Sequence, residues 1–365
     1  MNHDIPSFEE LSQFAQLIQP RPSVDHKAIS LSVEDYIARL DYHGIALLAL
    51  QMGLLPSEVA DALNQRKTMM VANDALKQRA LVELFDSFAN EGLNRSVLFK
   101  GSALAYSLYP QPWLRPRTDS DLLIDEADFT KFEKAFNKLG YQKLFAIEGK
   151  HISYQSTFSK RLAGKSVMNI DLHWRINNRQ ILSQSFNVDQ LLESNNQLDQ
   201  LSNNINIPSA VDSLLIASLH RLGHHLDDER LTWLYDIHLI ASSLSKDDWQ
   251  AVIKKCEQKQ LATITLNALN LCHALFATEI DQQGLAQLQT LSLNKEPSKL
   301  FLQRDLPEWR YFWHDLSAMQ SISEKLRLIL ENLIPSPAYV RQQMNTKSAL
   351  VAYVKRFIRG LKRIF

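Results

Sequence analysis

Two carboxylates in the middle of the chain have the spacing of a metal-binding pair. Asp119 and Asp121 stand in the stretch TDSDLLI, where they run directly into an apolar segment. Residues two apart on a β-strand point to the same face of a sheet. Two like charges that lead into a protein core are costly unless a positive group compensates them. A divalent cation is the usual compensation, so this segment predicts a metal site on a strand.

A second segment with chemical potential precedes the acidic pair. The apolar run at residues 97–99 predicts a short buried strand. Residues 100–102, Lys-Gly-Ser, interrupt this run before a segment with the composition of a helix. Three prolines then force irregular backbone ahead of Asp119: Pro110, Pro112 and Pro116.

The order of these segments resembles the active-site motif of the DNA polymerase β-type nucleotidyltransferases. In that superfamily a Gly-Ser or Gly-Gly turn after a strand begins a helix, and a later strand carries Asp-x-Asp. The stretch FKGSAL followed by R-x-x-x-D-x-D-L-L is most similar to a bacterial family of uncharacterised nucleotidyltransferases. The resemblance implies a third carboxylate on a later strand, and Asp171 in the stretch VMNIDLHW supplies one.

The resemblance implies a reaction as well as a fold. Such an enzyme moves a nucleoside monophosphate from a nucleoside triphosphate to a hydroxyl acceptor, and two divalent ions assist the transfer. Oxygen ligands suit Mg²⁺ or Mn²⁺. Asp119, Asp121 and Asp171 are therefore the implied catalytic residues and metal ligands. The implied nucleotide-binding residues are Lys100, Gly101, Ser102, Arg115 and Arg117.

Structural roles stay open for the same carboxylates. Asp119 can cap a turn, and Asp171 can pair with Arg175 at the end of its strand. The chain therefore has two interpretations of different class. It is an active nucleotidyltransferase, or it is a non-catalytic binding or accessory protein of the same fold in a biosynthetic pathway. The ordered acidic motif favours the enzyme, whereas no motif identifies the acceptor molecule.

A polar pattern in the C-terminal half belongs to the same resemblance. The order H…R-L-x-W-L-x-D is formed by His220, Arg230, Trp233 and Asp236. The resemblance implies that His220, Arg230 and Asp236 build a polar network beside the cleft, and contact of His220 or Arg230 with substrate stays open. His173 also matches the family, and it is expected to support the metal site.

Zinc is a competing interpretation of the histidines. His220 and His224 are four residues apart, so they can share one face of a helix. No cysteine joins them, and Arg221 between them would repel a cation. The spacing alone therefore gives weak support for a zinc site.

The composition limits the class of protein. The 365 residues carry 40 basic and 40 acidic side chains, so the whole chain has no strong signal for nucleic-acid binding. Two cysteines, Cys256 and Cys272, are too few for a disulfide framework and predict buried thiols. The N-terminus lacks a secretory signal, and no apolar run has the length of a membrane span. We expect a cytoplasmic protein, with association at the membrane surface left open.

Hydrophobic periodicity predicts an α+β fold that is predominantly helical. Strand-like and helix-like runs alternate in one part of the chain, where residues 151–158 and 166–173 are expected to pair around Gly164. A small mixed-sheet nucleotidyltransferase core is then flanked by helical regions. The expected parts are an N-terminal helical region (1–94), the core (95–180), a C-terminal helical domain (181–335) and a basic amphipathic tail (336–365).

The tail differs in charge from the rest of the chain. No acidic residue follows Glu331, whereas seven basic residues do. Apolar residues recur at helical spacing from Val351 onwards, which predicts a basic amphipathic helix. Three outcomes stay open for it: packing on the helical domain, contact with an anionic membrane surface, or binding of an acidic partner.

Overall fold

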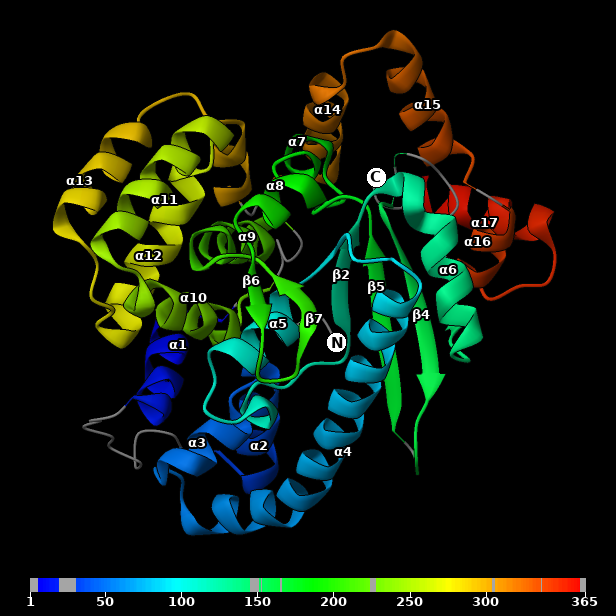
Figure 1. The fold of residues 1–365 in the computed structure, drawn as a ribbon. Helices are drawn as coiled ribbons and strands as arrows, with labels where there is room; N and C mark the ends of the chain where they lie inside the picture. The colour runs from blue at the N-terminus through cyan, green and yellow to red at the C-terminus, as the bar shows by residue number, and fades with distance from the viewer. Residues whose placement is uncertain are drawn as a thin grey trace.

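The computed structural model describes residues 6–19, 31–144, 151, 153–164, 166–223, 228–303, 306–335 and 337–361. The fold is α+β and predominantly helical, as the sequence predicts. One mixed sheet lies in the middle of the molecule, and helices surround it (Figure 1).

The sheet has five strands in the order β1-β2-β5-β4-β3. β2 and β5 are parallel, and the other neighbours in this order are antiparallel. Because β2 and β5 point the same way, the chain between them must cross over, and α6 (Phe129–Lys138) lies on this connection. The strands are β1 (Ser96–Phe99), β2 (Ser120–Ile124), β3 (Gln142–Lys143), β4 (Gln155–Arg161) and β5 (Val167–His173).

One face of the sheet packs against α6 and the long helix α4 (Ser57–Asn90). Apolar side chains of the second half of α4, including Leu84 and Phe88, share a buried cluster with α6 and the strands. In that cluster Phe88 contacts both Phe132 and Phe136 of α6 edge to face. The second half of α4 therefore belongs to the core of the sheet, although it lies before residue 95.

A small hairpin departs from the sequence expectation. Residues after 180 were expected to be helical, but β6 (Asn196–Leu198) and β7 (Ser202–Ile207) form a two-stranded sheet. Alternation in SNNINI explains this, because Ile205 and Ile207 point into the cluster that packs on the main sheet. The hairpin extends the core of the sheet past residue 180.

A second and larger hydrophobic core joins the N-terminal helices to helices of the C-terminal half. Leu11, Phe14 and Leu40 from the N-terminal helices are buried with Leu234 and Leu269 from the C-terminal half. The cores thus cross the expected boundaries at residues 94 and 180, and the division of the chain into four parts stays a prediction. The two cysteines are buried free thiols, as predicted.

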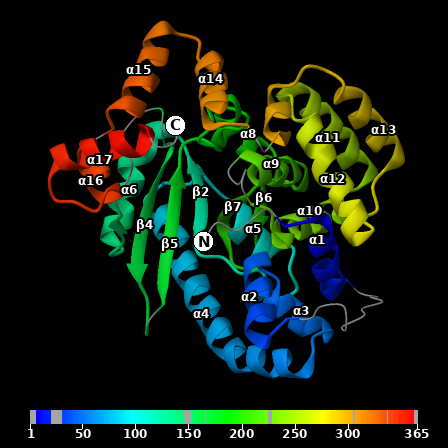
Figure 2. The same ribbon diagram turned by 180° about the vertical axis from the view of Figure 1, so that it is seen from behind.

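The remaining helices lie on several sides of the sheet, and those of residues 246–291 form a group away from it (Figures 1 and 2). Within the described residues no single helix is long and apolar enough to cross a membrane, and the pair α3 and α4 passes that test only together, bent by 118°. The helices not yet bounded are α1 (Phe8–Ala15), α2 (Val33–His43), α3 (Ala46–Met52), α5 (Lys100–Ser107), α7 (Gln180–Ser183), α8 (Val188–Glu193), α9 (Ala210–Gly223), α10 (Leu231–Ser243), α11 (Lys246–Lys259), α12 (Ala262–Phe276), α13 (Gln282–Leu291), α14 (Glu308–Ala318), α15 (Ile322–Leu333), α16 (Pro337–Gln343) and α17 (Ala349–Leu361).

Candidate active site

The centre of the site is a pair of carboxylates on neighbouring strands. Asp121 of β2 stands opposite Asp171 of β5, because the two parallel strands pair with these residues in register. Neighbouring strands lie about 4.8 Å apart, and residues at paired positions face the same side of the sheet. The hydrogen bonds of the sheet therefore set the separation of the two residues.

Strand β4 holds Asp171 from the other side. Thr157 pairs with Asp171 across the antiparallel ladder, and its hydroxyl donates a hydrogen bond to Asp171 Oδ1 at 2.6 Å. The side-chain amide of Gln155 donates to Asp171 Oδ2 at 3.0 Å. Because both oxygens are held, the plane of the Asp171 carboxylate is fixed.

Asp121 is held by two nitrogen groups. Lys100 Nζ lies 3.1 Å from Asp121 Oδ1, and His173 Nε2 lies 2.8 Å from the same oxygen. Burial alone would raise the pKa of Asp121, but the Lys100 ammonium and the His173 hydrogen bond outweigh it and hold the pKa well below its ordinary value. Asp121 is therefore ionised at neutral pH.

The protonation of His173 follows from its partner. Burial and then the charge of Lys100 lower the pKa of His173, so the ring is neutral at neutral pH. A carboxylate only accepts hydrogen bonds, so the proton of the neutral ring must be on Nε2, which donates to Asp121. Nδ1 is buried and has no hydrogen-bond partner among the described residues. His173 thus orients the Asp121 carboxylate.

Asp119 lies two residues before Asp121 and lines the same cleft. Burial, followed by the charges of Asp121 and Asp171, raises the pKa of Asp119 to about 6. Lys100 opposes this increase only in part. The third carboxylate therefore stands in a region of excess negative charge, which an added cation would relieve.

Helix α5 begins immediately after β1, and the turn is made at Lys100. Its backbone has φ 55°, a left-handed conformation that is strained for a residue with a side chain. From this turn the Lys100 ammonium pairs with Asp121, and the Lys100 side chain is 7% exposed. Ser102 is fully buried, and its Oγ lies 2.6 Å from Ser120 Oγ. The Ser102 hydroxyl therefore ties α5 to β2.

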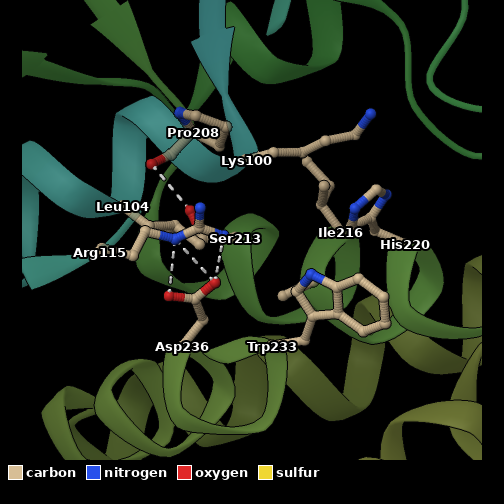
Figure 3. A pocket seen from close by; sticks show the side chains of 10 residues that line it. Lys100, Leu104, Arg115, Pro208, Ser213, Ile216, His220, Trp233 and Asp236 are labelled. Atoms are coloured by element: carbon tan, nitrogen blue, oxygen red, sulfur yellow. Dashed lines mark hydrogen bonds and ion pairs between the residues drawn. The ribbon is translucent and has the colours of Figure 1, made fainter. Parts of the chain in front are cut away.

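Arg115 connects the irregular segment before β2 to α10. Its guanidinium forms a bidentate pair with Asp236, with Nη2 2.6 Å from Oδ2 and Nε 3.1 Å from Oδ1. The hydroxyl of Tyr109 donates to the same carboxylate at 2.8 Å. A Cβ on Gly101 would lie 2.7 Å from Arg115 Nη1, so glycine makes room for this guanidinium. Figure 3 shows the pair beside Trp233.

Arg117 makes a similar connection to α4. Its Nη2 lies 2.6 Å from Asp74, and its Nη1 donates to the carbonyl oxygen of Pro112 at 3.0 Å. Lys77 of α4 donates to the carbonyl oxygen of Arg117 at 3.1 Å. Burial and then the charge of Arg117 lower the pKa of Lys77. These cations anchor the segment that leads to Asp119.

The cleft has a volume of about 460 Å³, and the start of α10 lines it with Thr232 and Trp233. This volume lies within the range of small-molecule sites. The Arg230 guanidinium lies 5.4 Å from the ring centres of Tyr42 and Trp233, and its Nε pairs with Asp228 at 2.8 Å. His220 meets Trp233 edge to face at 6.1 Å, and both side chains line the pocket of Figure 3.

A comparison with protein families shows which family the chain belongs to. The model of a family described as uncharacterised nucleotidyltransferase matches residues 26–277, which is more than half of the chain. The chain belongs to this family. A comparison with curated proteins gives no match. The matched part of this nucleotidyltransferase family member contains the five-stranded sheet, the carboxylate pair and α10.

The residues of the family member fit a divalent cation. One ligand atom from each of Asp121, Asp171 and His173 lies within 4.8 Å of the others. Carboxylate oxygens are the ligands that Mg²⁺ and Mn²⁺ prefer. His173 Nε2 is already hydrogen-bonded to Asp121. Asp119 is not part of this tight group, although it lines the same cleft. Metal binding by the three predicted carboxylates stays a prediction.

The cleft brings together most of the residues predicted for this nucleotidyltransferase site. Asp236 does not line this cleft but lines the pocket of Figure 3, where it holds Arg115. The Ser102 hydroxyl is buried against Ser120. His224, the proposed zinc partner of His220, lies outside the described residues. The cleft is lined by Lys100, Gly101, Arg115, Arg117, Asp119, Asp121, Asp171, His220 and Arg230.

Sequence reasoning missed the polar residues that hydrogen-bond to the predicted site residues. Thr157 and Gln155 fix Asp171, Lys77 anchors Arg117, and Tyr109 shares Asp236 with Arg115. A signal existed for Thr157, because it and Asp171 are each seven residues from Gly164, the expected centre of their hairpin. No comparable signal pointed to Lys77 or Tyr109.

Proposed function

We propose that this family member transfers a nucleoside monophosphate from a nucleoside triphosphate to a hydroxyl acceptor, with Mg²⁺ or Mn²⁺ as cofactor. One observation carries the proposal. Asp121 and Asp171 stand in register on neighbouring parallel strands, and they line an open cleft in a chain of a nucleotidyltransferase family.

The proposed reaction is an in-line displacement. The acceptor oxygen bonds to the α-phosphorus, the bond from that phosphorus to the bridging oxygen breaks, and pyrophosphate leaves. Divalent ions, when bound, would stabilise charge on the attacking and departing oxygens. Asp119, Asp121 and Asp171 are the proposed ligands. Asp171, which Thr157 and Gln155 hold, is also the proposed group that orients the acceptor hydroxyl and takes its proton.

Binding of the triphosphate is assigned to the start of α5 and to the cations of the cleft. The first turn of a helix offers backbone N–H groups to an anion. Lys100 adds an ammonium at this turn, and Arg230 adds a guanidinium with a side chain that is 41% exposed. Arg115 and Arg117 use several donors on protein groups, so their proposed share is the positive charge that they bring to the cleft.

Label transfer tests the reaction. The protein is incubated with Mg²⁺, each α-phosphate-labelled nucleoside triphosphate and fractions of a cell lysate, and acceptor-bound label is measured. Asp121→Asn should reduce transfer by about 100-fold or more, because it removes a charge from the metal site. Asp61→Asn, an exposed aspartate of α4, is the matched control and should keep full transfer. Equal transfer by a folded Asp121→Asn protein would contradict the proposal.

A non-catalytic binding role has an observation in its favour. Lys100 already neutralises Asp121, and Thr157 and Gln155 already satisfy Asp171, so these carboxylates are compensated without a cation. Thermal unfolding separates the two roles. The enzyme requires that nucleotide raises the melting temperature more with Mg²⁺ than without it, and that Asp119→Asn removes this increment. A nucleotide-independent melting temperature, together with no label transfer, would favour the binding protein.

A further inference from the structure

The C-terminal helices expose an unusual amount of apolar surface. Seventeen large apolar side chains are exposed on the described chain, and eleven of them lie between Trp309 and Ile358. Single exposed apolar residues are ordinary, whereas a concentration of them marks an interaction surface. Figures 1 and 2 place α14 to α17 together at one edge of the molecule.

Helix α15 carries the clearest part of this surface. Its exposed apolar residues are Ile322, Leu326, Leu330 and Leu333, which recur at helical spacing and form one stripe. The opposite side of α15 is covered, because Leu328 is buried against α14. The helix thus has two apolar faces, and only one of them is used by the fold.

Helix α17 adds a second exposed stripe and is joined to the end of α15. The hydroxyl of Tyr353 bonds to the carbonyl oxygen of Pro335, and Arg356 donates to the carbonyl oxygen of Asn332 at 3.0 Å. Ala352 is buried, so this side of α17 packs on the protein. Val351, Val354 and Ile358 remain exposed. The tail therefore docks through its small and polar residues and leaves its apolar stripe open.

The charge around the stripe of α17 has one sign, whereas α15 itself carries two acidic and two basic residues. Seven basic residues and no acidic residue follow Glu331. Arg341 and Lys347 line a shallow hollow of about 590 Å³ at the end of α16 and in the connection to α17, together with Asn345 and Thr346. Lys355 is exposed beside the apolar stripe of α17. Basic side chains next to an open apolar face match the chemistry of an anionic lipid surface.

We infer that the exposed faces of α15 and α17 bind the surface of a membrane that contains anionic lipids. Apolar side chains enter the boundary between headgroups and acyl chains, while Lys347 and Lys355 contact lipid phosphates. Trp309 and Trp313, both exposed on α14, are the residue type that favours this boundary. A second copy of the chain fits less well, because two α17 faces of the same positive charge would meet. This inference is independent of the proposed transfer reaction.

Vesicle co-sedimentation of the full chain tests the inference. The vesicles contain phosphatidylcholine alone or equal parts of phosphatidylcholine and phosphatidylglycerol, at low and high salt. We expect binding to the anionic vesicles at low salt, weakened by salt, and little binding to phosphatidylcholine alone. Leu326→Ser/Leu330→Ser should weaken binding at least about tenfold, and Lys347→Gln/Lys355→Gln about fivefold per charge.

Matched variants control for each change. Met69→Ser/Leu293→Ser alters two apolar residues that are 68% and 82% exposed elsewhere, and Lys246→Gln/Lys254→Gln alters two exposed lysines of α11. Both controls should bind like the unchanged protein, and circular dichroism should show every variant folded. The inference is overturned if the intact protein ignores anionic vesicles at low salt, or if the Leu326/Leu330 variant binds them unchanged. It is equally overturned if the intact protein does not bind vesicles but sediments as a dimer, and if the Leu326/Leu330 variant sediments as a monomer.

Discussion

Thr157 orients one of the proposed metal ligands directly. Its hydroxyl lies 2.6 Å from Asp171 Oδ1. Thr157→Val keeps the shape of the side chain and removes this donor, so we expect Mn²⁺ affinity to fall by about tenfold. Thr157→Ser restores the donor and should restore affinity. Calorimetric titration with Mn²⁺ measures both, and equal affinity in the valine variant would show that the hydrogen bond is not needed.

His43 gives the protein a specific sensitivity to acid. The ring is fully buried between Phe14 and Tyr42, and burial, followed by the charge of Arg39, lowers its pKa to about 4. The unfolded chain binds the proton at its ordinary pKa, so stability is complete above about pH 6.5 and is lost as pH falls toward 4. The loss between pH 7 and pH 5 is about 2 kcal/mol from this residue.

Replacement of His43 checks this pH dependence. His43→Phe has no proton to gain and keeps ring contacts, so its free energy of unfolding should change less between pH 7 and pH 5. Urea denaturation of both proteins at the two pH values gives the comparison. If both proteins lose the same free energy, another group is responsible for the acid sensitivity.

Single residues also show where sequence reasoning succeeds. Asp121 and Asp171 were predictable because the motif and the apolar runs placed both on strands. Gly101 was expected to bind nucleotide, and its Cβ position lies against Arg115 Nη1. No rule of spacing gives that contact, since helix α5 and an irregular segment with two prolines separate the two residues.

At the scale of elements, the pair of Arg115 and Asp236 holds α10 to the segment before β2. Both side chains are buried, and Tyr109 shares the carboxylate. Asp236→Asn leaves a buried guanidinium without its counter-charge, so we expect a loss of about 3–5 kcal/mol in the free energy of unfolding. Asp41→Asn breaks the exposed pair with Arg66 and should cost at most about 1 kcal/mol. Urea denaturation measures both, and similar costs would rule out a dominant role for burial.

Helices and strands with a clear hydrophobic periodicity were the ones that the sequence predicted. The apolar run at residues 97–99 became β1, and the alternating stretch at residues 166–173 became β5, because both patterns are typical of strands with buried faces. The hairpin of β6 and β7 was missed, since its strands are short and rich in Asn and Ser. Its stability comes from packing of Ile205 and Ile207 on the sheet, which is a tertiary contact.

At the scale of the whole molecule, the last two helices are appended to the fold. The tail helix is bonded to the end of α15 through Tyr353 and Arg356, and among the residues that the structure describes the two main cores contain none from α16 or α17. Removal of residues 337–365 should therefore lower the free energy of unfolding by about 1 kcal/mol or less. Urea denaturation of the shortened chain checks this. A loss of several kcal/mol would show that the tail is part of the main cooperative unit.

The division of the chain at residue 94 stays a prediction from hydrophobic periodicity. The second half of α4 packs on the sheet, and the N-terminal helices pack on the C-terminal ones. Which helix covers which face depends on contacts between residues far apart in the chain. Local patterns of charge and hydrophobicity contain little of that information.

The position of Lys100 has a consequence for how a metal ion and a nucleotide affect each other's binding. Its ammonium lies 3.1 Å from Asp121, so a cation that approaches this carboxylate competes with a charge that the protein itself supplies. A displaced ammonium becomes available to a phosphate in the same cleft. Cation and nucleotide would then strengthen each other's binding by an equal factor, as linkage requires. Either one alone would bind weakly, because Lys100 can leave Asp121 at little cost only when a triphosphate receives it.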